Sequence, residues 1–102
     1  MKSRSVTFTD TARADLREIY EWISAAASWE TAGRYIIRLE RFCYSLDLAS
    51  ERGSARHDVR AGLRIIGFEK RLSVAFEVTE DTVYILRIFR AGRNWEADFS
   101  DE

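Results

Sequence analysis

The segment TVYILRIFR (82–90) constrains the fold more than any other part of the chain. Its apolar residues fill both alternating sets of positions, with Tyr84, Leu86 and Ile88 in one set and Val83, Ile85 and Phe89 in the other. Successive side chains of a strand point to opposite faces of the sheet. A strand that is apolar on both faces is usually central, with both faces covered. The chain must therefore build a sheet around this segment and cover it on two sides.

The residues before this segment predict the rest of the sheet. Two further strand candidates, LRIIGF (63–68) and RLSVAFEV (71–78), are separated from each other and from 82–90 by turns short enough for an antiparallel meander. Within 71–78 one face carries Leu72, Val74, Phe76 and Val78. SVTFT (5–9) alternates apolar and polar residues, and we expect it to add beside the central last strand.

Two amphipathic helices are predicted between the first strand and the meander. Thr9 or Asp10 can cap the first helix, which ends within SAAAS (24–28). Ser28 can cap the second helix, which ends near Ser50. Apolar residues recur at helical spacing on one face of each: Ala12, Leu16, Ile19, Tyr20, Ile23 and Ala27 in the first, and Ala32, Tyr35, Ile36, Leu39, Phe42, Cys43 and Leu46 in the second.

The resulting element order is β-α-α-β-β-β, with a basic linker before the meander. The expected fold class is α+β, a single domain over residues 1–102 with two N-terminal helices packed on one face of a mainly antiparallel sheet. No stretch has the roughly 20 apolar residues of a membrane span, and the N-terminus lacks the apolar region of a secretory signal. One cysteine makes the cytoplasm the expected compartment, and no membrane partner is expected.

The second helix carries features beyond its core-facing stripe. Ile37, Tyr44 and Leu48 form a second, narrower apolar stripe. Arg34, Arg38 and Arg41, spaced four and three residues apart, line up on the face opposite the core stripe. A helix that is apolar on two sides has two neighbours, or one neighbour and a partner.

The composition limits the chemistry that the chain can perform. His57 is the single histidine and Cys43 the single cysteine, so a zinc site cannot be assembled from Cys and His, and neither a metal nor a cofactor is expected. Cys43 falls on the apolar stripe of the second helix, where a buried structural thiol is the expected role. His57 follows the pattern of a solvated loop residue, and no phosphate-binding glycine motif is present.

Arginine is the remaining functional signal. Of the 16 basic residues 14 are Arg, a bias that suits bidentate phosphate or carboxylate binding and that a GC-rich genome also produces. Arg87, Arg90 and Arg93 cluster where the last strand ends, close to Trp95, and strand alternation can place Arg64 and Arg87 together on the uncovered sheet face. Such a cluster can hold a phosphate and stack a base. Alternatively, these are ordinary exposed strand charges and Trp95 pads the sheet edge. Residues 52–93 carry nine Lys/Arg and five Asp/Glu, and the acidic end of the chain could screen this cationic middle through Glu96, Asp98, Asp101 and Glu102.

Four segments in order resemble the ParE/RelE superfamily of toxins from bacterial type II toxin–antitoxin systems. FTDTARADLREIYEWI is similar to that family's opening strand and first helix, and TAGRYIIRLERFCYSLDLA to its second helix. DVRAGLR resembles the ParE signature before the second strand, and VYILRIFRAGRNW the ParE ending. The chain departs from the ParE pattern with Arg90 in place of a common His and Asn94 in place of the usual Asp.

The resemblance implies one of two targets. ParE-like members act on DNA gyrase, and on that branch Arg87, Arg90, Arg93 and Trp95 are the expected target-binding residues. RelE-like members are ribosome-dependent mRNA endonucleases. On that branch Arg64 and Arg93 match basic active-site positions. His57, or another group, would act as acid or base, because the usual C-terminal Tyr falls near Phe99, which has no hydroxyl. The ParE branch fits better, and a non-toxic homologue that only binds its partner remains a third alternative.

The resemblance also implies a cognate antitoxin, ParD-like or similar, in a hetero-oligomeric complex. The antitoxin's C-terminal segment is expected to fold as it wraps the toxin. A surface for it is offered by apolar and basic residues of the helices: Trp22, Trp29, Arg34, Ile37, Arg38, Arg41, Tyr44 and Leu48. The cationic middle of the chain would attract an acidic antitoxin, and charge reversal at Arg38 and Arg41 is expected to weaken the complex mainly through its association rate.

Overall fold

The computed structural model describes residues 3–99 and confirms the predicted order of the main elements. These elements are β1 (Ser5–Phe8), α1 (Asp10–Ala26), α2 (Trp29–Tyr44), β2 (Ser54–Ala55), β3 (Leu63–Phe68), β4 (Leu72–Val78) and β5 (Thr82–Arg90). Two short 3-10 helices complete the chain, η1 (Ser45–Asp47) and η2 (Glu96–Phe99). The sequence did not predict β2, which pairs with β3 from within the expected linker.

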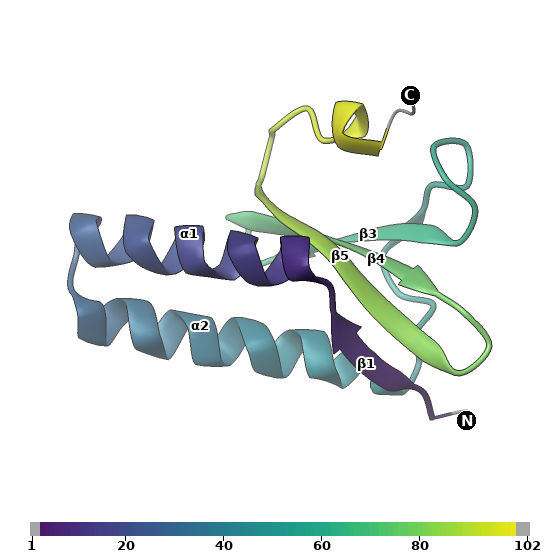
Figure 1. Ribbon diagram of the computed structural model, residues 1–102, viewed down its shortest axis with the longest axis horizontal. Coiled ribbons are helices and arrows are strands. Elements are labelled where there is room, and N and C mark those ends of the chain that lie inside the picture. The colour runs from purple at the N-terminus through teal and green to yellow at the C-terminus, as the bar shows by residue number, and fades with distance from the viewer. Residues whose placement is uncertain (1–2, 100–102) are drawn as a thin grey trace.

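The five strands form one mixed sheet in the order β1-β5-β4-β3-β2 (Figure 1). β1 runs parallel to β5, while β5, β4, β3 and β2 are antiparallel to their neighbours. β5 therefore lies between β1 and β4. Both sequence predictions for this strand, its interior position and its pairing with the first strand, are confirmed.

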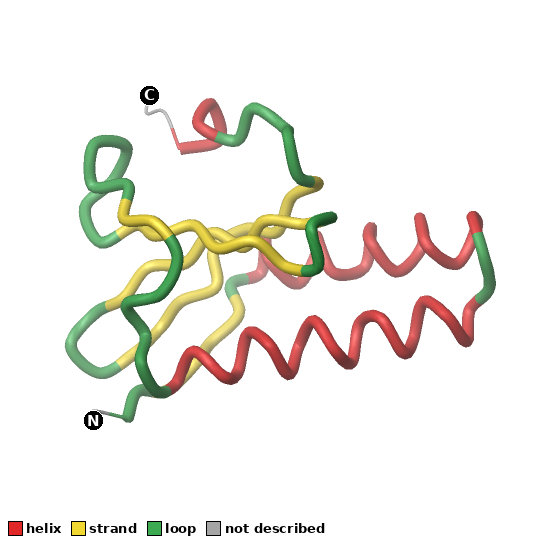
Figure 2. Tube along the Cα trace, turned by 180° about the vertical axis from the view of Figure 1, so that it is seen from behind, coloured by secondary structure: helices red, strands yellow, loops and turns green. Residues whose placement is uncertain are grey.

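The two helices form a hairpin, and each helix begins at a side-chain cap. The Thr9 hydroxyl accepts a hydrogen bond from the Ala12 amide at 3.1 Å, and the Ser28 hydroxyl accepts one from the Thr31 amide, also at 3.1 Å. The hairpin extends past the sheet, so the turn between α1 and α2 lies away from the strands (Figures 1 and 2). α2 ends at Tyr44, earlier than the predicted end near Ser50, and the Ser45 hydroxyl donates to the Phe42 carbonyl at 2.6 Å.

Two hydrophobic cores cover the two faces of the sheet. The larger lies between the helical hairpin and the face that carries Val74, Phe76 and Ile85, which confirms the predicted helix-facing side of β4. The smaller lies on the opposite face and is built from Leu63, Ala75 and Phe89, with Trp95 and Phe99 packed against them. β5 is thus covered on both faces, as its sequence requires.

A β-bulge in β5 overturns the simple alternation expected from the sequence. Ala75 pairs with Arg87 but Phe76 pairs with Ile85, so Leu86 is the extra residue. Ile88 therefore packs in the larger core together with Ile85, although alternation placed them on opposite faces.

The same register separates Arg64 from Arg87. Arg64 pairs with Phe76 and shares its helix-facing side, whereas Arg87 pairs with Ala75 on the opposite side. Alternation allowed both arginines on the face opposite the helices: Arg87 lies there, but Arg64 does not, because its pairing with Phe76 turns it to the helix-facing side.

Candidate binding site at the end of the last strand

Arg87 is held by Asp15 of α1. Asp15, which is only 7% exposed, accepts hydrogen bonds from Arg87 Nε at 2.8 Å and from Arg87 Nη2 at 3.2 Å. The same carboxylate accepts from the Ile88 backbone amide at 2.9 Å. β1 pairs with β5 only as far as Ile85, so α1 provides the acceptor that a longer β1 would have supplied. The hydrogen bond to Asp15 raises the pKa of Arg87.

The C-terminal segment lies over the sheet face opposite the helices and brings acidic groups to the arginines. Trp95 stacks on Phe89 with ring centroids 6.4 Å apart. Asp98 pairs with Arg93 at 3.0 Å and with Arg87 at 3.6 Å. Glu96 pairs with Arg56 at 2.7 Å, and the Arg56 guanidinium also lies over the Trp95 ring. The predicted screening is confirmed for Glu96 and Asp98, while Asp101 and Glu102 lie outside the described residues.

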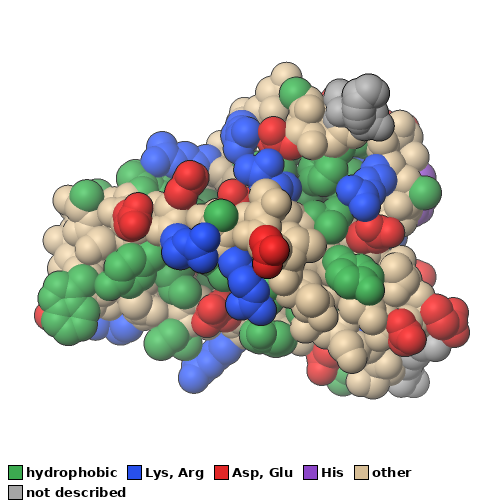
Figure 3. All heavy atoms as spheres, viewed as in Figure 1, with side chains coloured by type: hydrophobic (Ala, Val, Ile, Leu, Met, Phe, Trp, Pro, Cys, Tyr) green, Lys and Arg blue, Asp and Glu red, His purple; other side chains and the backbone are tan. Residues whose placement is uncertain are grey.

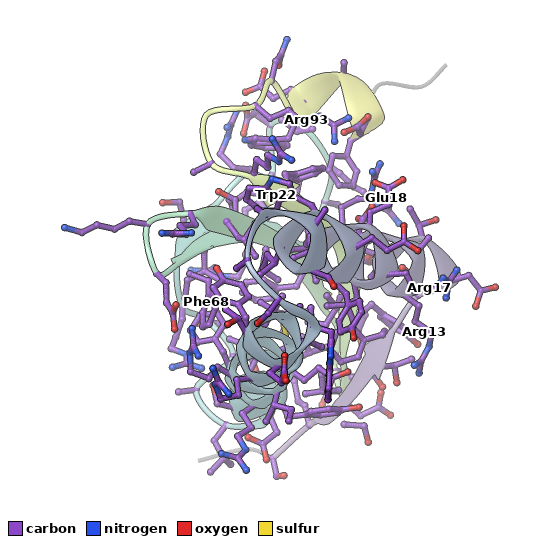
Figure 4. The ribbon with its side chains drawn as sticks, turned by 90° about the vertical axis from the view of Figure 1, so that its left-hand side faces the viewer. Arg13, Arg17, Glu18, Trp22, Phe68 and Arg93 are labelled. Atoms are coloured by element: carbon purple, nitrogen blue, oxygen red, sulfur yellow. The ribbon has the colours of Figure 1, made fainter. Side chains whose placement is uncertain are left out.

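Arg90 is the most available guanidinium of the three. Its Cζ atom lies 3.9 Å from the centroid of the Trp22 ring, and its guanidinium makes no hydrogen bond or ion pair with residues 3–99. A pocket of about 380 Å³ is lined here by Glu18, Ile19, Trp22, Arg90 and Arg93. Trp22 and Glu18 belong to α1, and Arg93 lies on the side of α1 that faces away from α2 (Figure 4).

The residues expected for the nuclease alternative do not gather in one cavity. His57 and Arg64 line a second pocket of about 320 Å³, whereas Arg93 lines the pocket with Trp22. His57 Nδ1 accepts a hydrogen bond from the Gly62 amide at 3.2 Å, and Arg64 Nε donates to the Arg52 carbonyl at 2.9 Å. His57 is exposed, as predicted.

The single thiol of the chain lies in the core. Cys43 is fully buried, and this burial raises its pKa to about 12. A thiol with so high a pKa is protonated at neutral pH and is a poor nucleophile. The predicted structural role of Cys43 is confirmed. No group of three potential metal ligands occurs within residues 3–99.

On the face of the helical hairpin shown in Figure 3, hydrophobic side chains lie among basic and acidic ones. The exposed fraction is 66% for Trp29, 49% for Ile37, 51% for Tyr44 and 44% for Leu48. Arg34, Arg38 and Arg41 are also exposed. Arg38 donates to both carboxylate oxygens of Glu69 and lies over the Tyr35 ring, and this contact lowers the pKa of Glu69. Tyr20, predicted on the core face of α1, is 36% exposed.

A family model for the ParE toxin of the type II toxin–antitoxin system parDE matches residues 6–95. The chain belongs to the ParE toxin family. A chain from the chromosomal ParDE TA system of P. aeruginosa is 27% identical with a TM-score of 0.75, over 86% of this chain and 96% of that one. A chain from the RelBE2 toxin–antitoxin complex of Mycobacterium tuberculosis shares the fold at 21% identity and a TM-score of 0.66, over 91% and 97% of the two chains. The search of curated proteins returned no significant match.

Sequence reasoning missed two contacts that organise the arginines of this ParE-family toxin. Asp15 binds Arg87, and Glu18 lines the pocket of Arg90. Trp22 belongs to the predicted antitoxin surface, and its ring also lies under Arg90, a contact that the sequence did not predict. A Trp on α1 gives no sequence signal for a partner 68 positions later.

No helix within residues 3–99 is long and apolar enough to cross a membrane.

Proposed function

We propose that this ParE-family toxin inhibits DNA gyrase, and that the end of β5 provides the target-binding surface. The observation that carries the proposal is the guanidinium of Arg90, which lies over the Trp22 ring and lines one pocket with Arg93. Arg93 reaches the same pocket and is only partly neutralised by Asp98. Arg87 supports this surface from inside, through Asp15. Trp95 supports it by holding the C-terminal segment on Phe89.

The mRNA endonuclease alternative is less well supported. It needs basic groups and an acid or base around one scissile phosphate. The separation of Arg93 from His57 and Arg64 argues against such an arrangement. The ring of Phe99 packs edge-on against Trp95 and offers no hydroxyl for proton transfer.

We further infer that a cognate antitoxin, ParD-like or similar, neutralises the toxin by covering the helical hairpin. The antitoxin surface consists of Trp29, Arg34, Ile37, Arg38, Arg41, Tyr44 and Leu48. These residues combine exposed apolar side chains with arginines, which suits an amphipathic segment that carries acidic residues. Trp22 is reassigned from this surface to the target site because of its contact with Arg90.

The proposal is tested with the purified chain, freed from any antitoxin, in two parallel reactions. One follows gyrase supercoiling and the accumulation of cleavage complexes, and the other follows mRNA on translating ribosomes. We expect inhibited supercoiling and intact mRNA. Cleaved mRNA with normal supercoiling would indicate that the toxin acts on translating ribosomes and not on gyrase. The absence of both effects would indicate a homologue that only binds its antitoxin.

A further inference from the structure

We propose that the pocket formed by Trp22, Arg90 and Arg93 binds a single carboxylate of an acidic, partly apolar peptide segment in a protein partner. The inference rests on the proposed function, because the pocket lies within the target-binding surface. It adds the chemistry that the surface recognises, a glutamate or aspartate side chain rather than a phosphate.

Arg90 is prepared for an anion before any ligand arrives. Its guanidinium lies over the Trp22 ring, with Cζ 3.9 Å from the ring centroid, so the indole covers one side of the group. The N–H donors lie along the edge of the guanidinium, and none of them bonds to a residue within 3–99. Because Trp22 already restricts the side chain, less conformational entropy is lost when a carboxylate binds.

The charges around the pocket favour one carboxylate over a nucleic-acid strand. Two guanidiniums and the carboxylate of Glu18 line the pocket, so its formal charge suits a single negative group. Asp98 pairs with Arg93 at its border. A polynucleotide would bring a row of phosphates towards these two carboxylates, whereas nucleic-acid sites present a continuous basic patch or stripe. Planar guanidiniums also match a carboxylate in a bidentate geometry.

The remaining wall of the pocket is apolar. Ile19 and the Trp22 ring line it together with the arginines. A side chain next to the bound carboxylate can pack there, so the pocket selects for an acidic residue beside an apolar one. This combination is typical of a protein segment and excludes a simple inorganic anion as the best ligand.

The test is a titration of the whole chain with the blocked tripeptide acetyl-leucine-glutamate-leucine-amide, followed by the indole N–H signals in NMR. The three tryptophans report separately: Trp22 in the pocket, Trp29 at the exposed start of α2, and Trp95 on Phe89. We expect a saturable shift at Trp22 alone. The glutamine analogue should bind at least about tenfold more weakly, because a charge-assisted hydrogen bond is lost.

Variants connect that shift to the pocket. Arg90→Gln should abolish it, and Arg90→Lys should weaken it, because lysine keeps the charge but lacks the planar fork. Glu18→Gln should strengthen binding roughly twofold by removing a like charge. Arg17→Gln is the control. It removes one positive charge, as Arg90→Gln does, but from the exposed side of α1 away from the pocket, and it should leave the Trp22 shift unchanged.

Four outcomes would overturn the proposal: no shift at millimolar peptide, equal binding of the glutamine analogue, shifts of all three indoles together, or tighter binding of a single-stranded oligonucleotide. Inhibition of gyrase by a chain that does not bind the peptide would leave the proposed function intact and remove only the ligand assigned to the pocket. Peptide binding without gyrase inhibition would retain the pocket and exclude the gyrase proposal.

Discussion

At the scale of single residues, Asp15 connects the helical hairpin to the arginine end of β5. It accepts from the Arg87 side chain and from the Ile88 amide, so its removal leaves a poorly solvated guanidinium and an unpaired backbone donor. We expect Asp15→Ala to lower the free energy of unfolding by about 3 kcal/mol. Asp15→Asn keeps an acceptor for Ile88 and should cost roughly half as much.

Urea denaturation of both variants measures this effect. Glu21→Gln provides the control, because Glu21 is an exposed residue of the same helix, and such a change is usually within about 0.5 kcal/mol of neutral. If Asp15→Ala is no more destabilising than this control, the Asp15–Arg87 contact does not form as described.

A second residue-scale prediction concerns the turn between β3 and β4. Glu69 and Lys70 have backbone φ angles of 51° and 59°, a region that glycine adopts without a steric cost. Lys70→Gly should therefore raise the free energy of unfolding by about 0.5–1 kcal/mol, and Lys70→Ala should bring no such gain. A thermal shift of Lys70→Gly equal to that of Lys70→Ala would show that the turn is not strained at this position.

At the scale of elements, the sequence predicted each main helix and strand because their hydrophobic periods were clear. The positions of the arginines were less predictable. Alternation along 82–90 failed after the bulge at Leu86, because a bulge depends on cross-strand pairing that the sequence does not encode locally. The contact of Trp22 with Arg90 and that of Asp15 with Arg87 join residues about 70 positions apart, and only the tertiary fold brings them together.

The C-terminal segment gives the prediction at this scale. η2 is attached to the sheet through Trp95, Phe99 and ion pairs on the protein surface. Exposed pairs contribute little, so the aromatic packing should dominate its attachment. We expect Trp95→Ala to cost about 1–2 kcal/mol in the free energy of unfolding and to speed amide hydrogen exchange at Phe89.

The charge variant Glu96→Gln is the matched comparison for this segment. It removes the ion pair with Arg56 but leaves the aromatic packing, so its effect should stay within about 0.5 kcal/mol. A larger loss in Glu96→Gln than in Trp95→Ala would mean that charge rather than packing holds the segment.

At the scale of the whole molecule, the surfaces proposed for the antitoxin and for the target lie on different parts of the chain. Arg34 and Arg41 are exposed on α2 and form no ion pair with described residues, whereas Arg38 is partly neutralised by Glu69. Charge reversal at Arg38 and Arg41 should slow association with the antitoxin, mainly at low salt, and change the dissociation rate little. Association kinetics across a salt series measure this, and unchanged rates at low salt would remove these arginines from the interface.

The central claim is that the arginine end of β5 binds gyrase. The most direct test is equilibrium binding of the N-terminally labelled chain to gyrase, measured by fluorescence anisotropy. The double variant Arg90→Gln/Arg93→Gln is compared with Arg13→Gln/Arg17→Gln, which removes the same charge from the exposed side of α1. We expect at least about tenfold weaker binding for Arg90→Gln/Arg93→Gln and a change within about twofold for Arg13→Gln/Arg17→Gln. Equal affinity of both double variants, or a greater loss in the second, would contradict it.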